Sequence, residues 1–119
     1  MLCNIDVNKD NTIDTTALFC GDAEYKAIEA MQQKNRLGHV DIYKVGHHGS
    51  KNALRESSAK ILSPKISLFS VGVGNTYGHP TQTTLDYCAN VGSQIYRTDN
   101  QGTITCYIHP NKINVKTTK

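Results

Sequence analysis

Three short segments of the sequence carry side chains that can bind a metal ion or transfer a proton. Each segment contains glycine, whose backbone allows close turns. Together they supply two carboxylates and three imidazoles, which is the composition of a metal site. Taken singly, each residue also has a structural explanation, such as a helix cap for Asp22. The segments are Gly21-Asp22-Ala23-Glu24, Gly46-His47-His48-Gly49-Ser50 and Asn75-Thr76-Tyr77-Gly78-His79-Pro80.

The elements that must position these segments follow from the periodicity of apolar residues. Each segment comes directly after a run that predicts a strand and before a pattern that predicts a helix. Gly38 is the expected end of the first helix, and residues 98–102 are expected to form a turn. The sequence predicts strands over 2–7, 13–20, 40–45, 66–73, 94–97, 103–108 and 112–116, and helices over 23–37, from 51 or 52 to 62, and from 81 or 82 to 90.

The alternation of strands and helices predicts an α/β fold. We expect a mixed, mainly parallel sheet with helices packed on it, and antiparallel strands at its ends. The carboxyl ends of parallel strands open on one edge of a sheet, where ligands bind. If the three strands are neighbours, the two carboxylates and three imidazoles meet in one crevice. No Gly-x-Ser-x-Gly elbow and no dinucleotide-binding glycine motif competes with this site.

The bulk composition indicates one soluble globular domain over residues 1–119. Hydrophobic residues make up 38% of the 119 residues and charged residues 19%, which does not suit a disordered chain. No apolar run is long enough to span a membrane, and no signal peptide is visible at the N-terminus. The net charge of +3 is too small and too scattered to argue for nucleic acid by itself. The four cysteines form no Cys-x-x-Cys pair, so we expect buried free thiols rather than a zinc finger.

A calcium loop is an alternative reading of the N-terminal hairpin turn. Asp6, Asn8, Asp10 and Asp14 have roughly the spacing of calcium ligands. The sixth loop position, which needs glycine, holds an asparagine, and the twelfth holds Ala17 instead of an acidic ligand. The sequence therefore favours a simple turn, and calcium-dependent folding would be the sign of the alternative.

In order and spacing, four segments resemble the C-terminal half of metallo-β-lactamase-fold hydrolases, and most of all the soluble domain of the ComEC-type DNA-internalisation competence proteins. Bacterial phosphorylcholine esterases are among the relatives of that family. The similarity covers roughly residues 15 to 105. Its segments are Leu18 to Glu24, Asp41 to Ser50, Asn75 to Pro80 and Ile95 to Gly102.

The resemblance implies roles for individual residues in hydrolysis of a phosphodiester or a related ester. Asp22 resembles the carboxylate that bridges two metal ions, zinc or manganese. One of His47 and His48 resembles a ligand of the second metal, and His48 is the preferred assignment. His47 would then reach a substrate phosphate or the metal-bound water. Glu24 resembles an acid beside the metals or the phosphate. His79, with Tyr77 and Asn75, resembles a loop on the substrate side.

The sequence departs from this family in one respect that limits the expected activity. The His-x-His-x-Asp-His motif of the N-terminal half, which supplies most metal ligands, does not occur in this chain. The chain therefore resembles half of an αββα sandwich. We expect weak or no metal binding and little hydrolase activity from the chain alone. We also expect an apolar sheet face that the remainder of the domain, or a second copy of the chain, would cover.

Two functions remain open at this stage. The first is the C-terminal portion of a metal-dependent phosphodiesterase or nuclease domain, from a bacterial protein involved in DNA uptake and associated with a membrane. The second is a non-catalytic module in which the scaffold binds nucleic acid or a protein partner and the metal ligands are relics. Metal lost on substitution of Asp22 or His48 would indicate the first. Binding that survives a chelator would indicate the second.

Overall fold

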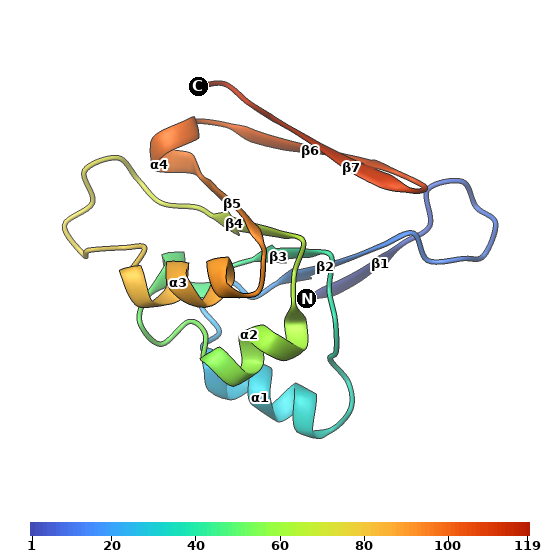
Figure 1. The fold of residues 1–119 in the computed structure, drawn as a ribbon, viewed down its shortest axis with the longest axis horizontal. Helices are drawn as coiled ribbons and strands as arrows, with labels where there is room; N and C mark the ends of the chain where they lie inside the picture. Colours follow the sequence, from blue (N-terminus) through green and yellow to red (C-terminus); the bar gives the residue numbers. More distant parts are fainter.

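The computed structural model describes all residues from Met1 to Lys119. Its main sheet has five strands in the order β1-β2-β3-β4-β5, and a two-stranded sheet pairs β6 with β7 (Figure 1). β1 is antiparallel to β2, and the pairs β2–β3, β3–β4 and β4–β5 are parallel. The expected mixed, mainly parallel sheet is therefore confirmed. The strands are β1 (Leu2–Ile5), β2 (Thr15–Phe19), β3 (Ile42–Lys44), β4 (Ile66–Phe69), β5 (Gln94–Arg97), β6 (Ile104–His109) and β7 (Lys112–Thr117).

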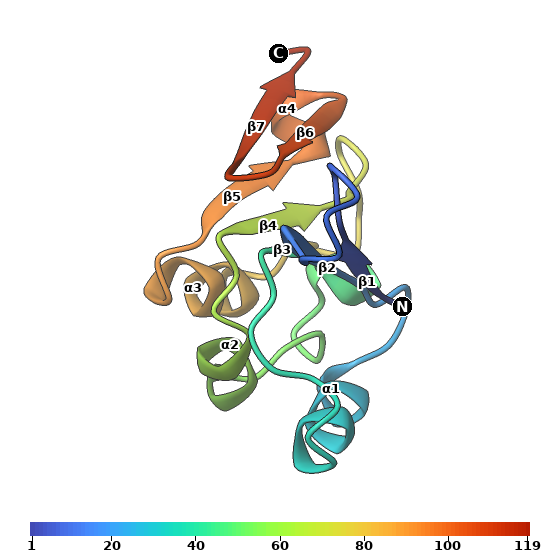
Figure 2. The same cartoon turned by 90° about the vertical axis from the view of Figure 1, so that its right-hand side faces the viewer.

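Helices cover one face of the main sheet. They are α1 (Tyr25–Gln33), α2 (Glu56–Leu62) and α3 (Gln82–Asn90), with a 3-10 turn η1 (Gly46–Gly49) and a single helical turn α4 (Thr98–Gln101). Figures 1 and 2 show α1, α2 and α3 together on the same side of the strands. Alternate strand residues point to this side, and the core between the sheet and the helices includes Leu18, Tyr43, Phe69, Leu62 and Cys88.

The β6–β7 hairpin lies on the other side of the sheet from the helices (Figures 1 and 2). Ile42 and Ile66, which face away from the helices, are each only 4% exposed. In the hairpin, half-buried apolar residues alternate with exposed ones, as in Ile104 and Cys106 on either side of Thr105. This alternation is expected when one face of a strand packs against apolar surface. The hairpin therefore covers part of the face that we expected to be open.

Several predicted element boundaries are wrong. The strand predicted over 2–7 ends earlier, at Ile5, as β1. The strand predicted over 13–20 begins later, at Thr15, and ends at Phe19, as β2. The helix predicted over 23–37 covers only Tyr25–Gln33. It ends before Gly38 because Asn35 already adopts a left-handed backbone, with a φ of 54°. Residues 98–101, predicted as a turn, form α4.

Two further elements are shorter than predicted: the helix expected from residue 51 or 52 begins at Glu56 as α2, and the strand expected over 66–73 ends at Phe69 as β4. The helix predicted to start at residue 81 or 82 is α3, and the last predicted strand is β7. All four cysteines are free thiols, but only Cys88 is buried and the other three are partly exposed. No helix is both long and apolar enough to cross a membrane.

Candidate functional site

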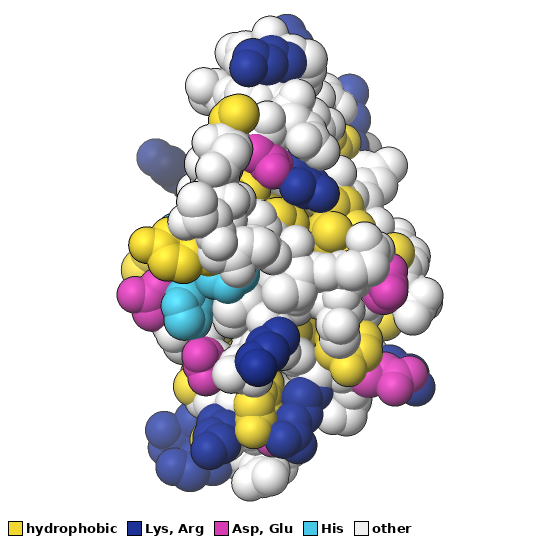
Figure 3. Space-filling view, turned by 90° about the vertical axis from the view of Figure 1, so that its left-hand side faces the viewer, with side chains coloured by type: hydrophobic (Ala, Val, Ile, Leu, Met, Phe, Trp, Pro, Cys, Tyr) yellow, Lys and Arg dark blue, Asp and Glu magenta, His cyan; other side chains and the backbone are white.

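The three candidate loops meet at the carboxyl ends of β2, β3 and β4, which are neighbours in the sheet. Asp22, His47, His48, Tyr77 and His79 line one open hollow of about 340 Å³. The ring centroid of His47 lies 6.5 Å from that of His48 and 5.8 Å from that of His79. The structure thus brings together one carboxylate and the three imidazoles. Figure 3 shows histidine side chains gathered on one face of the molecule.

Two glycines allow the His-His loop to lie this close to its neighbours. A Cβ at Gly46 would overlap the carbonyl oxygen of Ala23, and one at Gly49 would lie 2.7 Å from side-chain atoms of Phe69 and Pro80. The backbone N–H of His47 donates a hydrogen bond to the carbonyl of Gly21, at 2.8 Å. The loop after β3 is therefore fastened directly to the loop that carries Asp22.

The backbone of both histidines is left-handed, with φ of 45° at His47 and 54° at His48. This conformation is uncommon for residues other than glycine, although histidine adopts it more often than most. It costs of order 1–3 kcal/mol per residue and persists only where the surrounding contacts hold it. Such residues cluster at functional sites, so the backbone is an independent sign that this loop is specialised.

His47 and His48 each use Nδ1 for a hydrogen bond, and the Nε2 atom of each ring has no hydrogen-bond partner within the chain. Nδ1 of His48 lies 2.7 Å from the carbonyl oxygen of Ser70. A carbonyl can only accept, so Nδ1 carries the proton, and in the neutral ring Nε2 has a free lone pair. Nδ1 of His47 lies 3.2 Å from Oε1 of Glu24. A histidine that binds metal commonly has its other nitrogen held in this way.

Asp22 does not cap the helix that follows it. The N-cap position of α1 is Glu24, and no side chain caps that end. The Asp22 side chain is exposed and makes no hydrogen bond within the chain. A capping role, the structural alternative for Asp22, is therefore excluded, because the helix starts later than the apolar pattern indicated. The carboxylate faces the hollow with both oxygens available to a ligand.

The loop after β4 is organised by Asn75. Its side-chain amide donates to the carbonyl of His79 at 2.7 Å, and its Oδ1 accepts the backbone N–H of His79 at 3.1 Å. The Tyr77 ring stacks on His79, with centroids 6.0 Å apart and an angle of 26° between the planes. Tyr77 is 81% exposed. Asn75 therefore shapes the loop, whereas Tyr77 and His79 present their rings to the hollow.

Two residues that hold the site were not singled out in the sequence. The carbonyl of Ser70 fixes the His48 ring, and the Thr98 hydroxyl accepts from the N–H of Val71 and donates to its carbonyl, both at 2.8 Å. These contacts join segments 22 and 27 residues apart. No local pattern signals them, because they depend on strand order and on a backbone carbonyl that any residue type provides.

The donor types suit a divalent metal, but their number does not complete a site. Imidazole and carboxylate are the ligands that zinc and manganese accept in proteins. No three His, Cys, Asp or Glu side chains are arranged so that they could hold one ion. Within this chain, Asp22 and His48 are therefore suited to be part of a metal site and not the whole of it.

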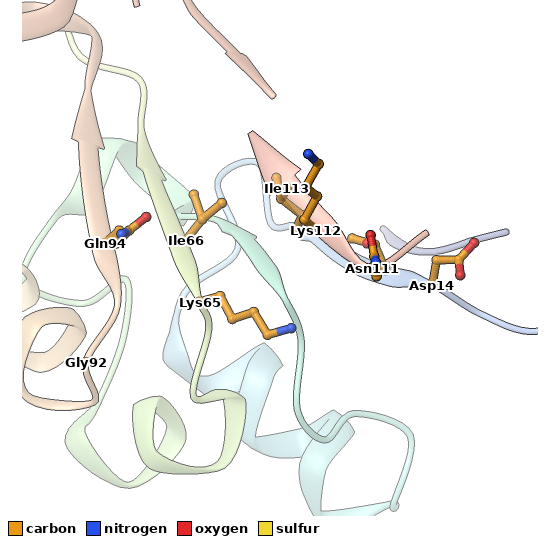
Figure 4. Close-up of a pocket in the computed structure, with 9 residues that line it drawn as sticks. Asp14, Lys65, Ile66, Gly92, Gln94, Asn111, Lys112 and Ile113 are labelled. Atoms are coloured by element: carbon orange, nitrogen blue, oxygen red, sulfur yellow. The ribbon is translucent and has the colours of Figure 1, made fainter. Parts of the chain in front are cut away.

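A larger hollow, of about 430 Å³, lies at the opposite end of the sheet (Figure 4). Lys65 and Gln94 line it at the starts of β4 and β5, and Asn111 and Lys112 line it from the tip of the β6–β7 hairpin. It contains no histidine or cysteine. Lys65 is paired with Asp41 at 3.1 Å. This hollow offers none of the chemistry of the histidine cluster.

Comparison with known proteins finds relatives with names from competence and recombination. The chain is 40% identical over 74 residues to ComE operon protein 3 of Bacillus subtilis, covering 62% of this chain and 9% of that protein. It is 30% identical over 90 residues to Competence protein ComA of Neisseria gonorrhoeae, covering 73% of this chain and 13% of that protein. It is 25% identical over 101 residues to Recombination protein 2 of Haemophilus influenzae, covering 85% of this chain and 13% of that protein. The chain thus spans about a tenth of the length of these relatives. No family model and no solved structure matches the chain.

Proposed function

We propose that this chain, similar to competence-related proteins much longer than itself, is the C-terminal portion of a metal-dependent phosphodiesterase domain that acts on DNA. We further propose that the domain is a metallo-β-lactamase-type αββα sandwich, of which this sheet and its helices form one half. Activity would require the remainder of the domain. We also propose that the longer protein containing this chain is associated with a membrane.

The observation that carries this proposal is the arrangement of His48 and Asp22. His48 is held by a backbone carbonyl, so its Nε2 lone pair faces the hollow that the free carboxylate of Asp22 also lines. We assign both residues as metal ligands. When bound, the metal ions would supply Lewis-acid activation of water and of the phosphoryl group.

The other residues of the hollow have roles that do not require them to bind metal. His47 and Glu24 form an imidazole–carboxylate pair at 3.2 Å that can hold and transfer a proton. His79 and Tyr77 lie across the hollow, where they can contact the substrate. Asn75 keeps their loop closed. The missing ligands would come from the rest of the domain, which is why we expect the isolated chain to be inactive.

The test is the metal content and activity of the longer protein that contains this chain. We expect Asp22→Asn and His48→Ala each to lower metal affinity and phosphodiester hydrolysis by at least about 100-fold, since even residues behind metal ligands are worth 10- to 100-fold. His109→Ala, in the hairpin, is the matched control and should change neither. Unchanged metal content in Asp22→Asn and His48→Ala would refute the assignment. Hydrolysis of phosphorylcholine esters but not DNA would refute the substrate.

A non-catalytic DNA-binding module is the second candidate function. It is favoured by the finding that no three metal-binding side chains share one position in this chain. In that case DNA binding by the longer protein should persist in a chelator and in the Asp22→Asn variant, and no hydrolysis should be detectable with any divalent metal. Chelator-sensitive hydrolysis would exclude it.

A further inference from the structure

The sheet face opposite the helices is covered unevenly along its strands. Ala17, Ile42 and Ile66 lie side by side on this face in β2, β3 and β4, and are 3%, 4% and 4% exposed. The next residue of β2 on the same face, two positions further along, is Phe19, which is 42% exposed. The cover therefore stops one row of residues short of the carboxyl ends of these strands.

The strand register defines the residues of this last row, which we name the open row. Phe19 is paired with Lys44, Lys44 with Leu68, and Leu68 with Tyr96, so the four side chains cross the sheet on one face. Lys44, Leu68 and Tyr96 are partly exposed. Phe19 and Lys44 are the last residues of β2 and β3, so two of the loops that line the histidine hollow begin directly after the open row.

Lys44 is the one charged residue of the open row, and it has no acidic partner. Its ammonium group donates to the carbonyl oxygen of the next residue, Val45, at 3.2 Å, and none of the ion pairs within the chain includes it. Burial lowers the pKa of Lys44 from its ordinary value of 10.5. An ammonium group has three donors, and removing it from water without a carboxylate partner is costly. A wholly apolar cover over this row would therefore bury an unpaired charge.

We propose that the open row is covered by an apolar segment of the longer protein, from outside residues 1–119, that places one Asp or Glu carboxylate against Lys44. The chain covers only 9% to 13% of the length of its relatives, so such a segment has ample sequence to come from. A second copy docked through the same row fits less well, because the row contains no carboxylate and would bring two ammonium groups together. This inference rests on the proposed function, in which the rest of the longer protein completes the domain, and it names the contact through which the two parts meet.

Zero-length cross-linking of the longer protein with a carbodiimide tests the ion pair. The reagent activates a carboxyl group, and the Lys44 amine then attacks the acyl carbon, forming an amide as the urea leaves and the amine loses a proton. We expect peptide mass spectrometry to show Lys44 joined to an Asp or Glu outside residues 1–119. The internal control is the link between Lys65 and Asp41, which lie 3.1 Å apart within the chain. Links from Lys44 only to carboxylates of residues 1–119, as a second copy would give, or no link at Lys44 where the control link forms, would overturn the proposal.

The pKa of Lys44 provides a second test, measured by NMR of isotope-labelled methyl groups placed on the lysines. We expect the pKa of Lys44 to be higher in the longer protein than in the chain alone, by about one to three pH units, because a nearby carboxylate stabilises the charged form. Lys44→Met removes the signal and so identifies it. An equal or lower pKa in the longer protein would overturn the proposal. Both measurements are made without metal or substrate, so a longer protein that binds no metal would refute the proposed function and leave this ion pair standing.

Discussion

At the scale of single residues, the neighbouring histidines differ in what holds them. Nδ1 of His48 bonds a neutral backbone carbonyl, whereas Nδ1 of His47 bonds the ionisable carboxylate of Glu24. A carbonyl fixes which nitrogen is protonated and leaves Nε2 as a lone-pair donor. A carboxylate can accept either a hydrogen bond or the proton itself, which a backbone carbonyl does not do. This difference is the physical reason for proposing His48 as a metal ligand and His47 as a group that transfers a proton.

Gly46 tests how tightly the His-His loop is packed. Because an added Cβ would overlap the Ala23 carbonyl and lie 3.1 Å from Cβ of Cys20, we expect Gly46→Ala to lower the free energy of unfolding by about 1–3 kcal/mol. Urea unfolding followed by circular dichroism measures the change. Gly38→Ala is the control, since nothing lies within 4 Å of its Cβ, and should change stability by less than about 0.5 kcal/mol. Equal stability of both variants would contradict the packing seen at Gly46.

Cys88 should make the protein less stable at alkaline pH. Burial raises the pKa of its thiol to about 11, from 9.0. In the unfolded chain the thiol ionises first, so stability should fall as pH rises from about 9 to 11, by up to about 2–3 kcal/mol. The measurement is urea unfolding across this pH range, compared with Cys88→Ala to separate Cys88 from the other groups that ionise there. The fall should be smaller by that amount in the variant, and equal pH dependence would contradict the prediction.

At the scale of elements, each candidate loop is held by a neighbour that is distant in sequence. The loop after β3 is fastened to the one after β2 by the bond from His47 to Gly21, and the segment after β4 is fastened to α4 by Thr98. The neighbouring strands β2, β3 and β4 and the three loops on their carboxyl ends therefore form one connected unit. Loss of one of these hydrogen bonds should make a loop more mobile without unfolding the sheet.

Thr98 tests this fastening. Thr98→Val keeps the shape but removes the hydroxyl, leaving the N–H and carbonyl of the buried Val71 without their partner. We expect it to lower the free energy of unfolding by about 1–3 kcal/mol, and to speed hydrogen exchange of the Val71 amide. Thr98→Ser retains the hydroxyl and serves as the control. Protection of Val71 that is equal in the two variants would show that the hydroxyl does not hold this segment.

At the scale of the whole molecule, the β6–β7 hairpin covers only part of the sheet face opposite the helices. Phe19, at the end of β2, is 42% exposed on that face. Self-association of the chain, which the sequence predicts from an open apolar face, stays a prediction. The hairpin makes self-association less expected, because it already covers Ile42 and Ile66, which would otherwise be apolar surface.

We expect self-association at high protein concentration to involve Phe19. Phe19→Ser should weaken it by about tenfold or more, since burying one Phe side chain is worth about 1.5–3 kcal/mol. Sedimentation velocity over a range of concentrations gives the association constant. Tyr107→Ser, at a similarly exposed position on the outer side of the hairpin, should have no effect. A single monomeric species at the highest attainable concentration would contradict the expectation.

From local residue patterns alone, one can predict three loops that carry carboxylate or imidazole side chains, each following a strand. Apolar periodicity and glycine position are local properties, so they predicted the order of strands and helices, the mainly parallel sheet and α3 almost to the residue. Local reasoning failed where neighbours decide the outcome. The apolar pattern continues past Asn35, but the helix α1 ends before that residue, where the backbone is left-handed. At its other end α1 begins at Tyr25, so Asp22 is too far from the first turn to cap it.

That the three loops meet, and which of their atoms face the hollow, depends on contacts between distant segments. Their meeting requires β2, β3 and β4 to be adjacent, and strand order depends on pairing between segments about 25 residues apart. The free Nε2 of His48 depends on the Ser70 carbonyl, which any residue type would provide. The cover over the sheet depends on a hairpin from the far end of the chain. Local sequence specifies what each segment carries, whereas contacts between distant segments specify where it points.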